Sequence, residues 1–118
     1  MAARSFRILF RNITELTLRR ASLELPHGEF SNKGGAVPPD TIAPFTRAEW
    51  QSESGGLATG TEGIVVYSSD RGNLRIRWDN PFVGGNELEI NPPSGFDFTN
   101  TSIDGNDASV TVTFSPLV

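Results

Sequence analysis

The sequence contains no cysteine, so disulfides and thiolate metal sites are excluded. Basic residues are also few: the sequence has ten lysines and arginines and fourteen acidic residues, which gives a net charge of −4. A nucleic-acid-binding protein needs a basic surface to displace counterions from phosphates, so we expect no nucleic-acid partner. No segment approaches the ~18 consecutive apolar residues of a membrane-spanning helix. Near the N-terminus the apolar residues alternate with arginine, which does not indicate a signal peptide, so we expect a protein made in soluble form without one.

No long segment has the apolar spacing of a helix, whereas alternation with a period of two runs through most of the chain. The stretch from Phe6 to Arg11 is the first segment of this kind, and it predicts a strand with one buried face. After Leu16 the apolar phase shifts by one residue, which predicts a β-bulge around residues 19–20. Pro26 is expected to end that strand, because proline cannot donate a ladder hydrogen bond.

Residues 26–44 are rich in Gly, Pro, Asn and Asp and predict a long loop. The clearest hairpin joins residues 64–69 to residues 74–79 through a polar turn. Further strands are expected at residues 87–90, 96–98 and 110–114. About eight short strands in 118 residues predict one all-β domain over residues 1–118, either an antiparallel β-sandwich or a closed barrel.

The cationic residues concentrate near the N-terminus, as Arg4, Arg7, Arg11, Arg19 and Arg20. Alternation along strands scatters them, so a solvated sheet face is favoured over an anion-binding site. We also expect the strands at residues 6–11 and 110–114 to lie at sheet edges, where they would allow pairing between chains and a homo-oligomer.

Enzyme signatures are weak. His27 is the single histidine, and no G-x-S-x-G elbow is present to display a nucleophilic serine. The segment G-G-L-A-T-G-T at residues 55–61 has the glycines of a phosphate loop but lacks its lysine. The acidic turn at residues 104–107 is too short for a calcium loop. We therefore expect no enzyme, no metal and no cofactor, and a small hydrolase that uses His27 is only an alternative.

Aromatic residues flank the glycine-rich segments. Trp and Tyr are suited to a membrane interface because an apolar ring carries a polar edge. Trp78 is in phase with the strand residues Leu74 and Ile76, which favours burial in the core. Phe82 follows Pro81 in a segment without strand alternation, and partial exposure is expected.

Three segments together resemble the aegerolysin family: R-I-L-F-R-N-I-T at residues 7–14, T-G-T-E-G at residues 59–63 and W-D-N-P-F-V-G-G-N at residues 78–86. The sequence is most similar to the small subunit of the bacterial binary insecticidal crystal toxins, in which the last two motifs follow in the same order at similar spacing. Phe82 stands where the fungal W-D-x-P motif has a tryptophan. Thr59 stands where the fungal members have an acidic residue, and Leu23 stands where they have a loop tryptophan, and these two differences fit the insecticidal branch better.

The resemblance implies a β-sandwich without catalytic activity, which recognises a membrane lipid or receptor as one component of a two-component pore-forming toxin, insecticidal or cytolytic. The expected partners are a lipid, with a sphingolipid-like headgroup as one option, or a membrane receptor, and a larger pore-forming protein. The protein would be released or delivered to act at target-cell membranes. The candidate membrane-binding residues are Trp50, Thr59, Glu62, Tyr67, Trp78, Asp79, Asn80 and Phe82. The alternative is a carbohydrate- or protein-binding β-sandwich module without membrane activity.

Overall fold

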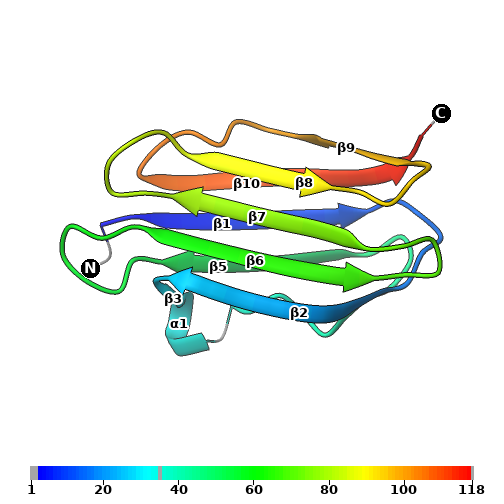
Figure 1. Ribbon diagram of the computed structural model, residues 1–118, viewed down its shortest axis with the longest axis horizontal. Helices are drawn as coiled ribbons and strands as arrows, with labels where there is room; N and C mark the ends of the chain where they lie inside the picture. Colours follow the sequence, from blue (N-terminus) through cyan, green and yellow to red (C-terminus); the bar gives the residue numbers. More distant parts are fainter. Residues whose placement is uncertain (1–2, 35, 118) are drawn as a thin grey trace.

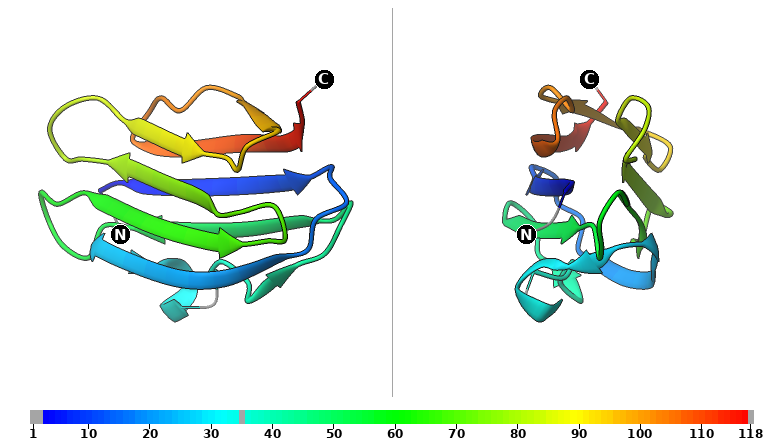
Figure 2. Two further views of the ribbon diagram at one scale, coloured as in Figure 1. Left: turned by 45° about the vertical axis from the view of Figure 1, so that its right-hand side comes forward. Right: turned by 90° about the vertical axis from the view of Figure 1, so that its left-hand side faces the viewer.

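In residues 3–34 and 36–117, which the computed structural model describes, the chain forms two five-stranded sheets that pack face to face (Figures 1 and 2). The strand order is β3-β5-β1-β10-β9 in one sheet and β4-β2-β6-β7-β8 in the other. The elements are β1 (Ser5–Asn12), β2 (Leu18–His27), β3 (Glu29–Phe30), α1 (Ser31–Gly34), β4 (Thr41–Ile42), β5 (Arg47–Glu53), β6 (Thr61–Ser68), β7 (Leu74–Asn80), β8 (Glu87–Asn91), β9 (Phe96–Asn100) and β10 (Asp107–Pro116). The predicted β-sandwich is confirmed.

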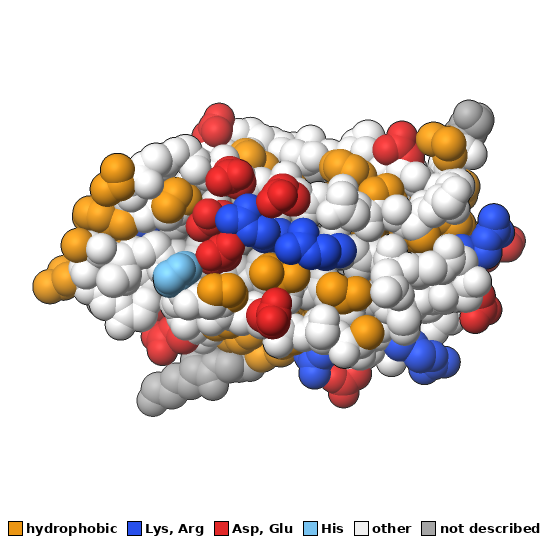
Figure 3. All heavy atoms as spheres, viewed as in Figure 1, with side chains coloured by type: hydrophobic (Ala, Val, Ile, Leu, Met, Phe, Trp, Pro, Cys, Tyr) orange, Lys and Arg blue, Asp and Glu red, His pale blue; other side chains and the backbone are white. Residues whose placement is uncertain are grey.

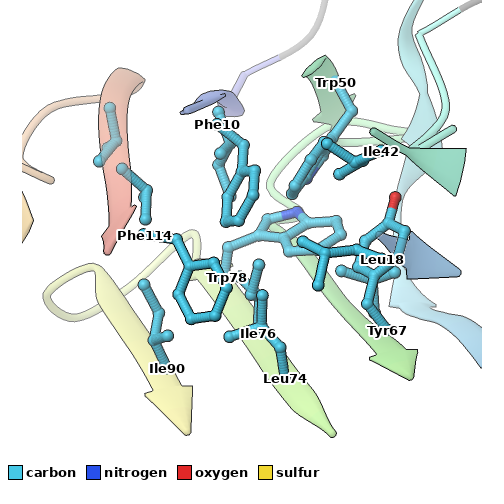
Figure 4. Close-up of a cluster of buried hydrophobic side chains, with 14 of the residues drawn as sticks. Phe10, Leu18, Ile42, Trp50, Tyr67, Leu74, Ile76, Trp78, Ile90 and Phe114 are labelled. Carbon is cyan, nitrogen blue, oxygen red and sulfur yellow. The ribbon is translucent and has the colours of Figure 1, made fainter. Parts of the chain in front are cut away.

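The strands form where apolar and polar residues alternate, and the alternation sets which face is buried. In β1 the side chains of Phe6, Ile8 and Phe10 are fully buried. Trp50 of β5 and Trp78 of β7 meet between the sheets with their ring centroids 6.0 Å apart. Figure 4 shows Trp78 among side chains from both sheets. Aromatic pairs of this kind contribute about 0.5–1.5 kcal/mol beyond the area that they bury.

The hairpin of β6 and β7 has the predicted position and turn. The predicted bulge in β2 is confirmed as a register shift between Arg20 and Ser22 against β6. Other expectations were wrong. β2 continues through Pro26 to His27, because a second register irregularity between Glu24 and His27 removes the need for a ladder hydrogen bond there. The segment 26–44 is not one loop, since it contains β3, α1 and β4.

The two strands expected at sheet edges are instead interior to their sheet. β1 lies between β5 and β10, and β10 lies between β1 and β9. The pair β1 and β10 is parallel, with Ser5 opposite Asp107 and Asn12 opposite Phe114, whereas the other strand pairs of the described residues are antiparallel. Pairing of neighbouring chains through β1 or β10 is therefore blocked by their own neighbours.

All strands run roughly along the long axis, so the connecting loops gather at the two ends of the molecule (Figure 1). The principal extents are 42 × 25 × 19 Å. One end, here called the tip end, carries the loops at residues 54–60, 81–86 and 101–106. The other end, here called the far end, carries the connections at residues 13–17, 43–46, 69–73 and 92–95. Within the described part of the chain, no helix has the length and hydropathy needed to span a bilayer.

Candidate functional site

The two motif loops lie against each other at the tip end. A Cβ atom at Gly60 would lie 2.6 Å from the carbonyl oxygen of Asn80 and 2.7 Å from Cα of Pro81. Real Cβ atoms do not approach so closely, so only glycine allows the two backbones to meet here. The T-G-T-E-G and D-N-P-F segments are therefore in direct contact.

The second glycine of the T-G-T-E-G motif serves the core. A Cβ atom at Gly63 would collide with the indole ring of Trp78, which lies directly opposite it across β6 and β7. The ring fills the space that the missing side chain leaves. Its Nε1–H donates a hydrogen bond to Oγ of Ser52, 2.8 Å away. The predicted burial of Trp78 is confirmed, and the glycine and the tryptophan of the two motifs act as one packing unit.

Asn80 ties the tip loops to the rest of the molecule. Its side chain is buried, and its amide donates to the carbonyl oxygens of Ser5 and Asn106, each at 2.9 Å, and to that of Gly105 at 3.2 Å. These acceptors belong to the start of β1 and to the loop at residues 101–106. One side chain therefore fixes the end of β7, the start of β1 and a third loop in a single arrangement.

Trp50 and Tyr67 are also fully buried. The hydroxyl of Tyr67 donates to the carbonyl oxygen of Pro39 at 2.7 Å. Burial raises the pKa of Tyr67 well above its ordinary value, with a smaller opposing effect from Arg20, so the phenol stays neutral. Four of the candidate membrane-binding residues thus lie inside the sandwich in this structure: Trp50, Tyr67, Trp78 and Asn80. A direct contact with a ligand would require these side chains to leave the core, where Asn80 fixes the tip loops and the three aromatic rings fill the space between the sheets.

The other four candidate residues reach the surface at the tip end. Glu62, Asp79 and Phe82 line a shallow cavity of about 260 Å³, together with His27 at its rim. Thr59 is exposed beside it, and its hydroxyl donates to the carbonyl oxygen of Gly56 at 2.7 Å, which closes the loop. Phe82 is 40% exposed, as expected from its position after Pro81. Membrane contact by these four residues stays a prediction.

The carboxylates at the cavity belong to a charged cluster on the outer face of β6, β7 and β8. Arg77 donates to Glu62 at 2.8 Å, to Glu89 at 2.8 Å and to Asp79 at 3.2 Å. Burial alone would lower the pKa of Arg77, but these carboxylates raise it above its ordinary value, so the guanidinium stays charged. Figure 3 shows acidic side chains around arginine on this face, with the histidine next to them.

Asp79 is the carboxylate whose ionisation is most affected. Burial raises its pKa above the ordinary value, the negative charge of Glu62 raises it further, and Arg77 offsets part of this effect. Nε2 of His27 lies 3.8 Å from Oε1 of Glu62. The cavity therefore offers carboxylate oxygens that accept hydrogen bonds, and the pKa of one of these acids, Asp79, is raised. Among the described residues, no group of three or more His, Asp or Glu side chains is arranged to hold a metal ion.

Apolar side chains project from the tip beyond this cavity. Leu57 is 95% exposed and Val83 is 83% exposed, and Figure 3 shows hydrophobic side chains gathered at this end. Arg4 holds the base of the loop, because its guanidinium lies 4.6 Å from the ring centroid of Phe82 and donates to the carbonyl oxygen of Phe82 at 2.9 Å. Leu57 and Val83 were not predicted to belong to the site, and Arg4 was expected only as part of a solvated sheet face. An apolar residue next to a glycine pair in a loop was the available signal for Leu57 and Val83.

No family model matches the chain. One similar sequence is an uncharacterized protein of Dictyostelium discoideum, which is 34% identical over 80 residues. The matched segment covers 66% of this chain and about 7% of that much longer protein.

Among solved structures, the chain is similar to Nakanori, which is described as a lipid binding protein. The TM-score is 0.80 over 98% of this chain and 72% of that chain, at 15% sequence identity. This likeness shows that the two chains share their fold. A sandwich of this shape agrees with the fold that the aegerolysin resemblance implies.

Proposed function

We propose that the protein recognises membrane lipid headgroups through its tip end, without catalysis, as the recognition component of a two-component pore-forming toxin. The observation that carries the proposal is the presence of exposed apolar side chains, Leu57, Phe82 and Val83, at the same end as a cavity that Glu62 and Asp79 line. The lipid-binding description of Nakanori supports lipid as the ligand class. The aegerolysin resemblance supports the larger pore-forming partner and action at target-cell membranes.

Two kinds of side chain at the tip end would have different roles in binding, one apolar and one acidic. Leu57 and Val83 would enter the boundary between headgroups and acyl chains, as exposed apolar residues of interfacial proteins do. Glu62 and Asp79 lie behind them and would accept hydrogen bonds from hydroxyl or ammonium groups of a headgroup. Phe82 joins the two regions, because its ring lines the cavity and is partly exposed at the tip.

Replacement of Phe82 tests this proposal. Loss of a ring that enters the interface removes about 1.5 kcal/mol, so Phe82→Ala should bind about tenfold more weakly to responsive vesicles. Flotation with vesicles of defined composition, including sphingomyelin, ceramide phosphoethanolamine and phosphatidylcholine, measures the affinity. Phe45→Ala is the matched control, because Phe45 is an exposed aromatic residue at the far end.

Equal binding by Phe82→Ala and the parent protein would place the contact surface elsewhere. Absence of binding to every vesicle and to target-cell membranes would overturn membrane recognition. A glycan array measured in parallel would then identify the carbohydrate-binding alternative. The role of a partner is tested by vesicle leakage with and without the protein encoded beside this one, since the proposal expects leakage only with both.

A further inference from the structure

The far end carries an apolar ridge between two hollows. Ile13 and Phe45 are exposed, and both side chains line each of the two hollows. The larger hollow, of about 430 Å³, is completed mainly by Leu16, Phe96 and Pro116, so its wall is mostly apolar, although Glu15 and Arg71 also line it. The smaller one, of about 350 Å³, is bounded by Arg11 and Arg47. An apolar wall and a cationic wall thus lie on opposite sides of one ridge.

The backbone conformation and the solvent exposure of Phe45 at the ridge are both energetically unfavourable unless the residue contacts a partner. Its backbone φ is 55°, in the left-handed region that phenylalanine adopts at a cost of about 1–2 kcal/mol. Its ring is also 66% exposed to solvent. Glycine or asparagine at this position would relieve both the strain and the exposure. Retained strain in a surface aromatic residue is typical of a contact site.

The arginines of the smaller hollow are not neutralised within the described part of the chain. Arg11 of β1 lies directly opposite Arg47 of β5, and both side chains are exposed. Like charges opposite each other on a sheet destabilise it. One step along the same face, Arg7 pairs with Glu49 at 2.6 Å, and elsewhere Arg20 pairs with Asp40 at 2.9 Å. No ion pair forms at Arg11 or Arg47 among the described residues. A protein of net charge −4 thus keeps a local pair of free cations beside an apolar hollow.

We propose that the far end is a docking surface for an acidic segment of a partner protein. Carboxylates of the segment would pair with Arg11 and Arg47, while an aromatic or aliphatic side chain enters the apolar hollow beside Phe45. This inference rests on the proposed function in one respect only: the far end would be the surface that contacts the larger partner protein. A tip end seated on a membrane leaves the far end directed away from it, about 42 Å along the long axis, where a second protein has access.

The form and charge of the far end favour a protein segment over an anionic membrane. The ridge is flanked by hollows, and a concave surface receives a protruding side chain better than it meets a flat bilayer. Glu15 and Asp70 lie at the same end and bound a further hollow with Arg19. A flat anionic surface would meet these carboxylates as well as the arginines. A narrow segment can place its carboxylates on the arginine side, while only its apolar side chain enters the hollow that Glu15 lines.

Nuclear magnetic resonance of the ¹⁵N-labelled protein tests the docking surface without lipid. The probes are a short synthetic peptide in which glutamates alternate with leucine and one tryptophan, and the same peptide with lysine in place of each glutamate. The acidic peptide should shift the amide signals of Ile13, Phe45 and Arg47, and the basic peptide should not. Arg11→Gln combined with Arg47→Gln should weaken the acidic peptide about tenfold, since two exposed charge pairs are lost.

Two single replacements make the result specific. Phe45→Ala should also weaken the acidic peptide, whereas Phe82→Ala at the tip end should leave it unchanged. Because these side chains are exposed, thermal unfolding should verify that each variant folds like the parent.

Equal shifts with both peptides, or no shift at the far end at millimolar acidic peptide, would overturn the proposal. Shifts at Phe45 and Arg47 only with phosphatidylserine vesicles would instead assign this end to anionic lipid. Failure of vesicle binding at the tip end would leave the peptide result standing, so the two proposals fail separately.

Discussion

Gly63 and Trp78 show how a small residue and a large one in different motifs depend on each other. The indole of Trp78 occupies the space over Gly63 and also contacts Trp50 and Ser52, which belong to the opposite sheet. A residue with a side chain at position 63 would push this ring out of its place. The ring would then lose both its aromatic contact and its hydrogen bond, so the glycine is required by the core.

Gly63→Ala is therefore expected to destabilise the protein by about 2–3 kcal/mol, through overpacking against a rigid buried ring. Urea unfolding followed by tryptophan fluorescence measures the change in the free energy of unfolding. Gly85→Ala is the matched control, because a Cβ atom there meets open space, and it should stay within about 0.5 kcal/mol of the parent. A Gly63→Ala protein as stable as the parent would contradict this account of the motif.

The β6–β7 hairpin is the element that presents the candidate site. Alternation buries Val65, Tyr67, Leu74, Ile76 and Trp78 on one face and leaves Glu62, Arg77 and Asp79 on the other. The strand ends then carry the two loops to the tip end, where Gly60 lets their backbones touch. The cavity is thus a product of strand register, since a slip by one residue would turn the carboxylates into the core.

Asn80 is expected to control the order of the tip loops more than the stability of the sheets. Asn80→Ala removes the amide hydrogen bonds to Ser5, Gly105 and Asn106 and leaves their partly buried carbonyl oxygens without that donor. We expect a loss of about 2 kcal/mol in the free energy of unfolding and faster hydrogen exchange in residues 81–86 and 101–106. Unchanged exchange in both loops would show that other contacts fix the tip. Asn86→Ala, which loses bonds to Ile103 and Gly105 closer to the surface, should have a smaller effect and is the control.

The molecule as a whole has two ends of different chemistry on one rigid sandwich. The tip end exposes Leu57 and Val83 and carries a cavity with carboxylates. The far end exposes Phe45 next to two arginines that form no ion pair with any residue that the structure describes. β1 and β10 connect the two ends through the middle of one sheet. A protein of this form is suited to bridge two different partners along its long axis.

Vesicle binding through the tip end should depend little on salt, because apolar side chains enter the interface, Glu62 and Asp79 contact a neutral headgroup by hydrogen bonds, and the net charge of −4 gives no attraction to anionic lipid. Flotation with neutral vesicles from about 0.05 to 0.5 M salt should change the affinity less than threefold. A steep fall in affinity with salt would point to the arginines of the far end as the membrane contact.

Much of the local structure follows from the sequence. Alternation of residue type predicted the principal strands, the phase shift predicted the bulge in β2, and the burial of Trp78 followed from its phase with Leu74 and Ile76. These features depend on which face of a strand is buried, and the alternation of apolar and polar residues with a period of two shows this directly.

The partners of each strand were decided only by the tertiary structure. Alternation in β1 is the same at an edge and in a sheet interior, so nothing local indicated that β10, about a hundred residues later, pairs with it in parallel. The same reason explains why Trp50, Tyr67 and Asn80 lie inside although their types suit a binding surface. It also explains why Arg11 and Arg47 lie opposite each other, because two arginines 36 positions apart become neighbours only when β1 and β5 pair in this register.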